Sequence, residues 1–304
     1  MNPSHVCILG GSGFVGRRIT SMLANQGVRV TMLTRHRDRN RDVLVRPEIS
    51  VVECDVYDPG QLTDGLRGAD TVINLVGILN SNKYKNQNFK RAHLDLCEVI
   101  LDAMTRVDVR RLIHMSASNA GADGPSEYLK TKGAAENLLK MRTLQGELDV
   151  TIFRPSVIFG PGDSFTNRFA DLLRRIPVAF PLACPDSRLQ PVHVNDVATC
   201  FTQAAANTRT FGQTYELCGP SSYTLFELVS MIAAAIGVRR KIIRLSPRQS
   251  ELQAKVMQHV PGQPFTPDNY QSLQLDSVCS GPFPEIFGIE PQAMEDTIAS
   301  YLNG

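Results

Sequence analysis

Tyr128 and Lys132 stand four positions apart in the segment YLKTK, and this spacing can support chemistry. Residues i and i+4 share one face of a helix, so the lysine ammonium can lie beside the tyrosine phenol. A free tyrosine has a pKa of about 10, and a neighbouring positive charge lowers that pKa toward the working pH. The phenol can then act as a general acid or base toward a bound substrate. A surface helix can carry the same spacing without chemistry, so the surrounding elements must decide.

A predicted helix carries this pair, and a serine-containing strand end precedes it. The helix begins at the PS dipeptide of 125–126 and continues with alanines and leucines at helical spacing. The strand end reads HMSAS at 114–118. A hydroxyl here can hydrogen-bond a substrate, and either Ser116 or Ser118 can supply it, while Ala117 is compatible with a site that lacks it. The alternatives stay open because one step along an extended chain reverses a side chain's direction.

A glycine-rich turn near the N-terminus stands between a predicted strand and a predicted helix, in HVCILGGSGFVGRRITSML. Its glycines allow a tight turn and a close approach of the backbone to a pyrophosphate, and the helix N-terminus offers N–H groups to the phosphates. A bare GxGxxG match is weak, but its place in a strand–turn–helix unit predicts a dinucleotide site. The predicted contacts are Gly10, Ser12, Gly13, Phe14, Val15 and Gly16.

The second predicted strand ends in TRHRD, with arginines where NAD-binding proteins place a carboxylate. A guanidinium suits the 2′-phosphate of NADP(H), whereas an acid would repel it. Arg35 and Arg37 are the candidates. The sequence therefore favours NADP(H), with NAD(H) as the alternative cofactor and a solvated basic loop as the interpretation without function.

Strand-like and helix-like segments alternate through the first half of the chain, which implies a parallel sheet with helices on both faces. We expect an α/β fold in which residues 1–160 form a doubly wound Rossmann domain, to which 190–218 return. A smaller domain for a substrate or partner follows over 161–304.

Two further strand ends should contribute to the dinucleotide site, because the carboxyl ends of parallel strands meet at one edge of the sheet. We expect Asp55 and Val56 to contact the edge of the adenine. The strand end that passes under the cofactor is predicted to comprise Asn74, Leu75, Val76 and Gly77. His93 and His114 are expected to pack or cap. No metal site is predicted, because no His, Asp, Glu or Cys cluster has ligand spacing.

Composition narrows the classes of function. The 304 residues carry a formal net charge of +2, which gives no reason to expect nucleic-acid binding. Seven scattered cysteines argue against a disulfide framework and for a reducing, cytoplasmic setting. No signal sequence is predicted, and no apolar run approaches the ~20 residues of a transmembrane helix. Peripheral attachment at an inner membrane through a partner stays open.

With these motifs in order, the chain resembles the short-chain dehydrogenase/reductase superfamily, in its extended or atypical branch. The resemblance implies that Pro155, Ser156 and Val157 pass the nicotinamide carboxamide and that Asp196 is a structural cap. It also implies that Tyr128 and Lys132 contact the cofactor as well as the substrate. The matching segments are GGSGFVG, CD at 54–55, NLVG, HMSAS, YLKTK, RPSVIFGPGD, QPVHVNDVA and YELCGPSSYTLFELV.

The C-terminal segments PFTPDNYQSLQLDSV and FGIEPQAMEDTIASYL resemble the subfamily that contains the dehydrogenase-like accessory subunit of respiratory complex I. This resemblance implies a tightly held NADP(H) that serves stability or assembly, with a respiratory subunit as partner. The alternative is an active NADP(H)-dependent oxidoreductase on an apolar carbonyl or alcohol, with Tyr128 as acid/base. A nucleotide-sugar epimerase or dehydratase is a weaker alternative. The apolar, proline-rich segment IPVAFPLACP over 176–185 suits an apolar ligand, a partner surface, a lid, or simple packing on its own domain.

Overall fold

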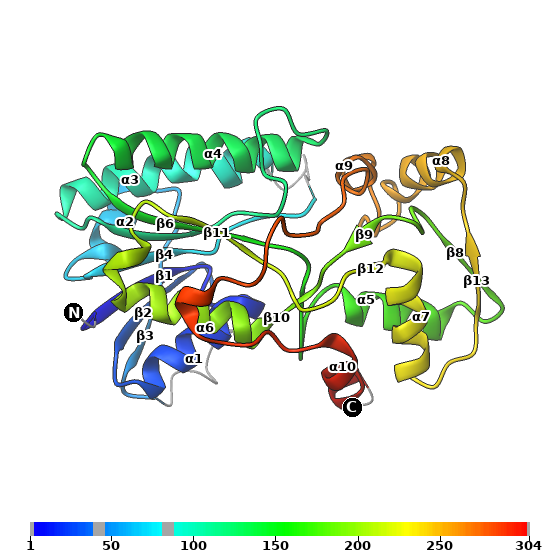
Figure 1. Cartoon of the computed structure of the whole chain (residues 1–304). Helices are drawn as coiled ribbons and strands as arrows, with labels where there is room; N and C mark the ends of the chain where they lie inside the picture. The colour runs from blue at the N-terminus through cyan, green and yellow to red at the C-terminus, as the bar shows by residue number, and fades with distance from the viewer. Residues whose placement is uncertain (1–2, 39–45, 81–87, 303–304) are drawn as a thin grey trace. The chain divides into compact units, whose positions relative to one another are not determined.

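The structure, a computed structural model, describes residues 3–38, 46–80 and 88–302. The chain divides into two compact units that each take several segments. The first unit comprises 1–116, 131–154 and 197–215, and the second comprises 117–130, 155–196 and 216–304. Figure 1 gives the labels of the elements used below.

A seven-stranded sheet forms the centre of the fold, in the order β11-β6-β5-β4-β1-β2-β3. Neighbouring strands pair in parallel from β3 through to β6. The expected α/β class with a doubly wound sheet is confirmed. The strands are β1 (His5–Leu9), β2 (Arg29–Thr34), β3 (Ile49–Glu53), β4 (Thr71–Asn74), β5 (Arg111–Met115), β6 (Asp149–Pro155) and β11 (Thr214–Leu217).

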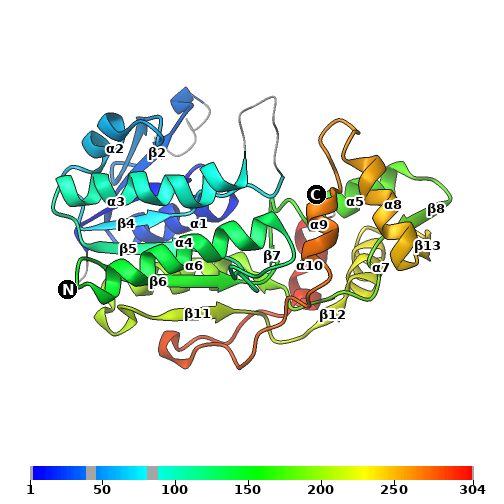
Figure 2. The ribbon, with the colours of Figure 1, turned by 90° about the horizontal axis from the view of Figure 1, so that it is seen from above.

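Helices cover both faces of this sheet, with α3 and α4 on one face and α1 and α6 on the other (Figures 1 and 2). The apolar runs of the central strands follow from this, because a parallel strand between two helical layers is buried on both sides. All five residues of β1 are buried. The helices are α1 (Phe14–Asn25), α2 (Pro59–Leu66), α3 (Leu96–Arg106), α4 (Glu127–Leu144) and α6 (Val194–Ala206), with a π-helix η3 (Arg91–Asp95) before α3 and a short η4 (Thr208–Thr210) after α6.

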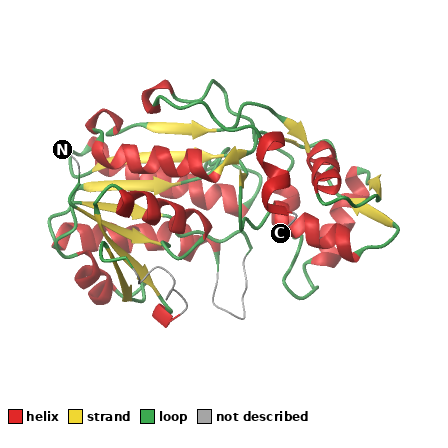
Figure 3. Cartoon of the chain, turned by 90° about the horizontal axis from the view of Figure 1, so that it is seen from below, coloured by secondary structure: helices red, strands yellow, loops and turns green. Residues whose placement is uncertain are grey.

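The second unit packs helices against three two-stranded ribbons, which Figure 3 shows as short strands among helices. The pairs are β7 with β10, β9 with β12, and β8 with β13. Its core gathers Phe159, Leu173, Leu228 and Ile298. The elements are β7 (Ile158–Phe159), α5 (Thr166–Arg175), β8 (Ala179–Leu182), β9 (Arg188–Leu189), β10 (Val192–His193), β12 (Tyr223–Thr224), α7 (Leu225–Ala235), β13 (Lys241–Arg244), α8 (Pro247–Met257), α9 (Pro267–Ser272), η5 (Glu285–Phe287) and α10 (Met294–Leu302).

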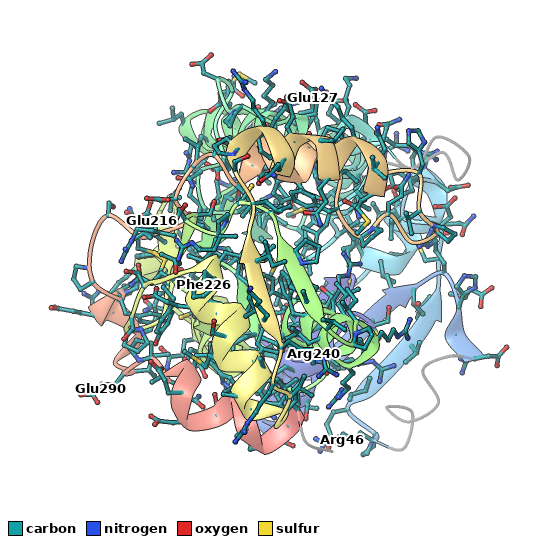
Figure 4. The ribbon with its side chains drawn as sticks, turned by 90° about the vertical axis from the view of Figure 1, so that its right-hand side faces the viewer. Arg46, Glu127, Glu216, Phe226, Arg240 and Glu290 are labelled. Carbon is teal, nitrogen blue, oxygen red and sulfur yellow. A yellow bond between two sulfur atoms is a disulfide. The ribbon has the colours of Figure 1, made fainter. Side chains whose placement is uncertain are left out.

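The apolar segment over 176–185 is part of this core. It forms β8, which pairs with β13, and Phe180 and Leu182 are buried in the second unit. Arg240, labelled in Figure 4 just before β13, fixes the start of the segment by donating to the carbonyl oxygen of Ile176 at 2.8 Å. Of the interpretations of this segment, packing on its own unit is the one that these contacts support.

A C-terminal segment, residues 276–280, ties distant parts of the second unit together. The carbonyl oxygen of Asp276 accepts a hydrogen bond from Asn119 Nδ2 at 2.8 Å. The carbonyl oxygen of Ser277 accepts one from the Ser156 hydroxyl, also at 2.8 Å. Cys279 forms a disulfide with Cys218. The sequence analysis argued against a disulfide framework and did not predict this single bond. These long-range contacts explain why 117–130 and 155–160 group with the C-terminal residues, although the sequence assigns them to the first domain.

Candidate dinucleotide-binding and proton-transfer site

The glycine turn forms the floor of a phosphate cradle in the first unit. Gly10 has a φ of 79°, a left-handed conformation that favours glycine, and α1 begins directly after the turn. A Cβ on Gly16 would lie 2.6 Å from Gly11 Cα and would also strike the carbonyl oxygen of Gly10. The N-cap of α1 is Gly13, so no side chain competes for the first N–H groups of the helix. This cradle fits a pyrophosphate at a helix N-terminus.

A groove of about 480 Å³ extends from this cradle across the carboxyl ends of β1, β2, β3 and β4. It brings together Gly10, Ser12, Gly13, Arg35, Asp55, Val56, Leu75, Val76 and Gly77 from the predicted cofactor contacts. Phe14, Val15, Gly16, Arg37 and Asn74 do not line it. The sequence analysis missed Tyr57, Asn88, Arg91 and Ala92, which line the groove as well. Tyr57 stands two residues after Asp55 and could have been found from that spacing, whereas nothing in the sequence marks Arg91.

Asn74 does not line the groove but holds a residue that does. Its side chain is buried, and Oδ1 accepts from the backbone N–H of Val76 at 3.1 Å while Nδ2 lies 3.2 Å from His114 Nδ1. Burial, followed by the charge of Lys132, lowers the pKa of His114 well below its usual value. A neutral His114 therefore accepts from Asn74, and the amide in turn fixes the loop over 75–77 that faces the groove.

Lys132 lies under the same loop, in the first unit. Its side chain is 4% exposed, Nζ donates to the carbonyl oxygen of Met115 at 2.8 Å, and a Cβ on Gly77 would lie 3.4 Å from that nitrogen. Burial lowers the pKa of Lys132 to about 8. A residue other than glycine at position 77 would thus press on the ammonium. Lys132 lies next to the loop that lines the groove but does not itself line it.

His93 buttresses this loop. Nε2 accepts from the backbone N–H of Ile78 at 3.3 Å, so the ring proton stands on Nδ1 and is donated to Thr131 Oγ1 at 2.9 Å. Burial, then the neighbouring Lys132, lowers the pKa of His93 to about 2. The imidazole is therefore neutral, and it links η3 to α4 below the groove.

Ser116 is engaged in a buried ionic cluster. Its hydroxyl, 3% exposed, donates to Glu136 at 2.6 Å. Arg154 donates to both oxygens of the same carboxylate, at 2.7 and 2.6 Å, and Lys140 adds a third cationic contact at 3.0 Å. Burial would raise the pKa of Glu136, but hydrogen bonds from Arg154, Ser116 and Lys140 bring it below its usual value. The proton of Ser116 is directed at this carboxylate, whereas Ser118 is half-buried and belongs to the second unit.

Tyr128 is also half-buried and belongs to the second unit, although the same helix carries Lys132. Asp268, from α9, accepts the backbone N–H of Glu127 at 2.8 Å and so caps the first turn of α4. Burial, and then the charge of Asp268, raises the pKa of Tyr128 to about 12. At neutral pH the phenol holds its proton and can donate a hydrogen bond.

The segment predicted to line the nicotinamide also belongs to the second unit; it comprises Pro155, Ser156 and Val157. Ser156 is 7% exposed, and its hydroxyl bonds the carbonyl oxygen of Ser277 at 2.8 Å. Asp196 accepts from the backbone N–H and the side-chain amide of Gln292, at 2.8 and 3.0 Å. These two bonds tie the segment before α10 to the first turn of α6.

The fold and the glycine cradle define an NAD(P)-binding protein of the extended short-chain dehydrogenase/reductase type. Residues 6–218 match the NAD dependent epimerase/dehydratase family, and the chain belongs to that family. Among the described residues, no group of three or more His, Cys, Asp or Glu side chains could hold a metal ion, and no helix is long and apolar enough to cross a membrane.

Relatives include respiratory subunits and enzymes. The NADH-ubiquinone oxidoreductase 40 kDa subunit of Neurospora crassa is 30% identical over 78% of this chain, which spans only 62% of that subunit. The NADH dehydrogenase 1 alpha subcomplex subunit 9 of Rattus norvegicus is 27% identical over 95% of this chain and 77% of its own length. The ceramide reductase of Caulobacter vibrioides is 30% identical, over 79% of this chain and 73% of that protein.

Solved structures confirm the fold. The dTDP-glucose 4,6-dehydratase DesIV of Streptomyces venezuelae, crystallised with NAD and TYD, has a TM-score of 0.75, covers 98% of this chain with 95% of its own, and is 18% identical. MoeE5 in complex with UDP-glucuronic acid and NAD has a TM-score of 0.68 over 80% of this chain and 85% of its own, at 24% identity.

Proposed function

We propose that this protein binds NADP(H) as a structural nucleotide and serves as an accessory or assembly factor of a respiratory NADH dehydrogenase, attached to the membrane through that partner. The observation that carries the proposal is a difference between the nucleotide groove and the serine predicted to orient a substrate. The nucleotide groove gathers strand-end residues from four neighbouring strands, whereas the proton of Ser116 is directed at Glu136. The names of several relatives, which are subunits of such a complex, support the partner.

The preference for NADP(H) is supported by the end of β2. Thr34, Arg35 and His36 line the groove at this point, where a carboxylate would favour the ribose hydroxyls of NAD(H). A guanidinium offers two N–H groups to a phosphate in a fixed fork. Arg35 is thus suited to the 2′-phosphate.

A nucleotide bound to the native protein alone stabilises it by mass action, by about 2.7 kcal/mol at a hundredfold excess over Kd. In this role the cradle of Gly10 and Gly16 binds the phosphates, and Asn74 fixes the loop over 75–77 that lines the groove. None of these tasks requires a proton to move. When bound, the nucleotide could also supply hydride, which the alternative below requires.

The test compares purified protein with and without nucleotide. Stripping NADP(H) should lower the melting temperature and weaken binding to the respiratory partner subunit, and adding NADPH should restore both. Tyr128→Phe, which keeps the ring, should leave partner binding and nucleotide stabilisation unchanged. Loss of partner binding in that variant would count against a structural role.

The alternative is an active NADP(H)-dependent reductase of an apolar carbonyl, and one observation favours it. Lys132 is buried beside the groove with a pKa of about 8, and Tyr128 retains a donatable proton. A ceramide reductase among the relatives is consistent with an apolar substrate. Oxidation of bound NADPH by an added acceptor, abolished in Tyr128→Phe, would establish this activity. No oxidation of NADPH with any added aldehyde or ketone would count against this activity and leave the structural role as the remaining proposal.

A further inference from the structure

Arg91 and Tyr57 form a stacked pair at the adenosine end of the groove. The guanidinium carbon of Arg91 lies 4.5 Å from the centroid of the Tyr57 ring, and both residues line the groove together with Arg35. The two come from different elements. Tyr57 follows β3, and its backbone N–H donates to Asp55 Oδ1 at 3.1 Å. Arg91 opens the π-helix η3, and its backbone N–H donates to Asn88 Oδ1 at 2.6 Å.

Arg35 is a second guanidinium among the residues that line this groove. Burial raises the pKa of Tyr57, and the charges of Arg91 and then Arg35 oppose that shift. Within the described ranges, no ion pair with a carboxylate holds either arginine. Two cations at one end of an anion-binding groove repel each other unless an anion is shared between them. The stack holds one of them in place.

We propose that Arg91 is a specificity-determining residue for the 2′-phosphate of NADP(H), held by Tyr57 and acting opposite Arg35. The inference rests on the proposed NADP(H) preference and extends it to an element outside the usual strand-end motif. A stacked guanidinium loses less side-chain entropy when it binds than a mobile one does. Its fork then meets the phosphate from the side of η3 while Arg35 meets it from the side of β2.

The experiment measures Kd for NADPH and for NADH on the same purified, nucleotide-free protein by titration calorimetry. Arg91→Gln removes the charge and keeps a polar side chain of similar length. A charge-assisted hydrogen bond contributes about 1.5–3 kcal/mol, so NADPH should bind roughly 10-fold to 100-fold more weakly. The Kd for NADH should stay near its original value. Arg35→Gln should show the same selective loss.

Two further variants separate the phosphate contact from the stack. Tyr57→Phe keeps the ring and should keep the NADPH affinity, whereas Tyr57→Leu removes the aromatic face and should weaken NADPH selectively, by less than Arg91→Gln. Arg106→Gln is the matched control, because Arg106 pairs with Asp102 on the surface of α3 and does not line the groove. Circular dichroism and the melting temperature verify that each variant is folded.

The outcomes distinguish this inference from the proposal beneath it. If the unmodified protein binds NADPH and NADH equally, both the NADP(H) preference and the role of Arg91 are overturned. If it prefers NADPH and Arg91→Gln keeps that preference, only the role of Arg91 is overturned. An equal loss of both nucleotides would make Arg91 a wall of the adenine pocket, which also contradicts the inference.

Discussion

The two units of this protein are built by different means. In the first, the groove comes from residues 10–92, and its lining follows strand ends that lie close together along the chain. In the second, the contacts span long stretches of sequence: Asn119 to Asp276 is 157 residues, Glu127 to Asp268 is 141, and Ser156 to Ser277 is 121. The residues that line the groove thus lie within the first third of the sequence. The residues around Tyr128, the predicted acid/base, include contacts with the C-terminal third.

The boundary between the units falls within α4, between Lys130 and Thr131. Lys132 lies beside Gly77, which lines the nucleotide groove, and the pKa of Tyr128 responds to Asp268 in the C-terminal third. A change at Asp268 can therefore alter the acidity of Tyr128 without changing any residue that lines the groove.

The largest effect should come from the cradle of the first unit. Gly16→Val places side-chain atoms against the backbone of Gly10 and Gly11, where a Cβ alone already collides. We expect NADPH binding to fall below detection in calorimetry. Gly281→Val is the matched control, because a Cβ on Gly281 meets nothing within 4 Å, and it should bind as the original protein does. Binding by the Gly16 variant would show that the groove tolerates a different phosphate position.

The buried ionic cluster should give the next largest effect, on stability. Glu136→Ala leaves Arg154 without its carboxylate, and breaking a buried ion pair in this way costs about 3–5 kcal/mol. The lower end applies here, since the Arg154 side chain is 25% exposed. Chemical denaturation measures the loss. A loss below about 1 kcal/mol would mean that the cluster behaves as a surface pair does.

The same cluster predicts a pH dependence. The folded pKa of Glu136 lies below its ordinary value of 4.5, so its stabilising contribution is present above that value and is lost as pH falls through the folded pKa. Glu136→Gln keeps the size and one acceptor but cannot titrate. Its free energy of unfolding should therefore vary less between neutral and acidic pH than that of the original protein.

The sequence predicted the parts of the molecule that depend on local patterns. The glycine turn, the order of strands and helices, and Asp55 to Val56 at the groove all follow from motifs within a strand–turn–helix unit. It could not predict contacts that join distant segments, because no spacing rule connects Glu136 with Arg154 or Cys218 with Cys279. The direction of Ser116 was undecidable for a simpler reason, since a strand end can present either face.

The disulfide offers a test confined to the second unit. The Cys218–Cys279 bond closes a loop across 61 positions, and such a cross-link stabilises a fold by about 2–4 kcal/mol. The double variant Cys218→Ser, Cys279→Ser should lower the stability of the second unit by this order in native-state hydrogen exchange and leave the Kd for NADPH unchanged. Cys184→Ser, at a free cysteine of the same unit, is the control. A matching loss of nucleotide affinity would contradict the prediction that nucleotide binding depends only on the residues that line the groove of the first unit.

The smallest effect, and the most informative for function, concerns the phenol of Tyr128. Asp268→Asn preserves an acceptor for the N–H of Glu127 but removes the charge, so the pKa of Tyr128 should fall from about 12 while staying above 10, because burial is the larger cause. The difference in near-ultraviolet phenolate absorbance between each protein and its Tyr128→Phe counterpart measures this pKa. Asp276→Asn is the matched control, since Asp276 also accepts a backbone N–H, from Arg188 at 3.0 Å, and is not among the charges that shift Tyr128.

A raised pKa has a direct consequence for chemistry. A phenol that keeps its proton at neutral pH can donate it to a carbonyl, whereas taking a proton from an alcohol requires the phenolate, so any alcohol oxidation should be slow at neutral pH and speed up as pH rises. If the Asp268 variant gains alcohol oxidation that the original protein lacks, the C-terminal carboxylate is what suppresses the base. If the pKa of Tyr128 does not move, Asp268 serves only as a helix cap, and the C-terminal third controls the position of the tyrosine without controlling its acidity.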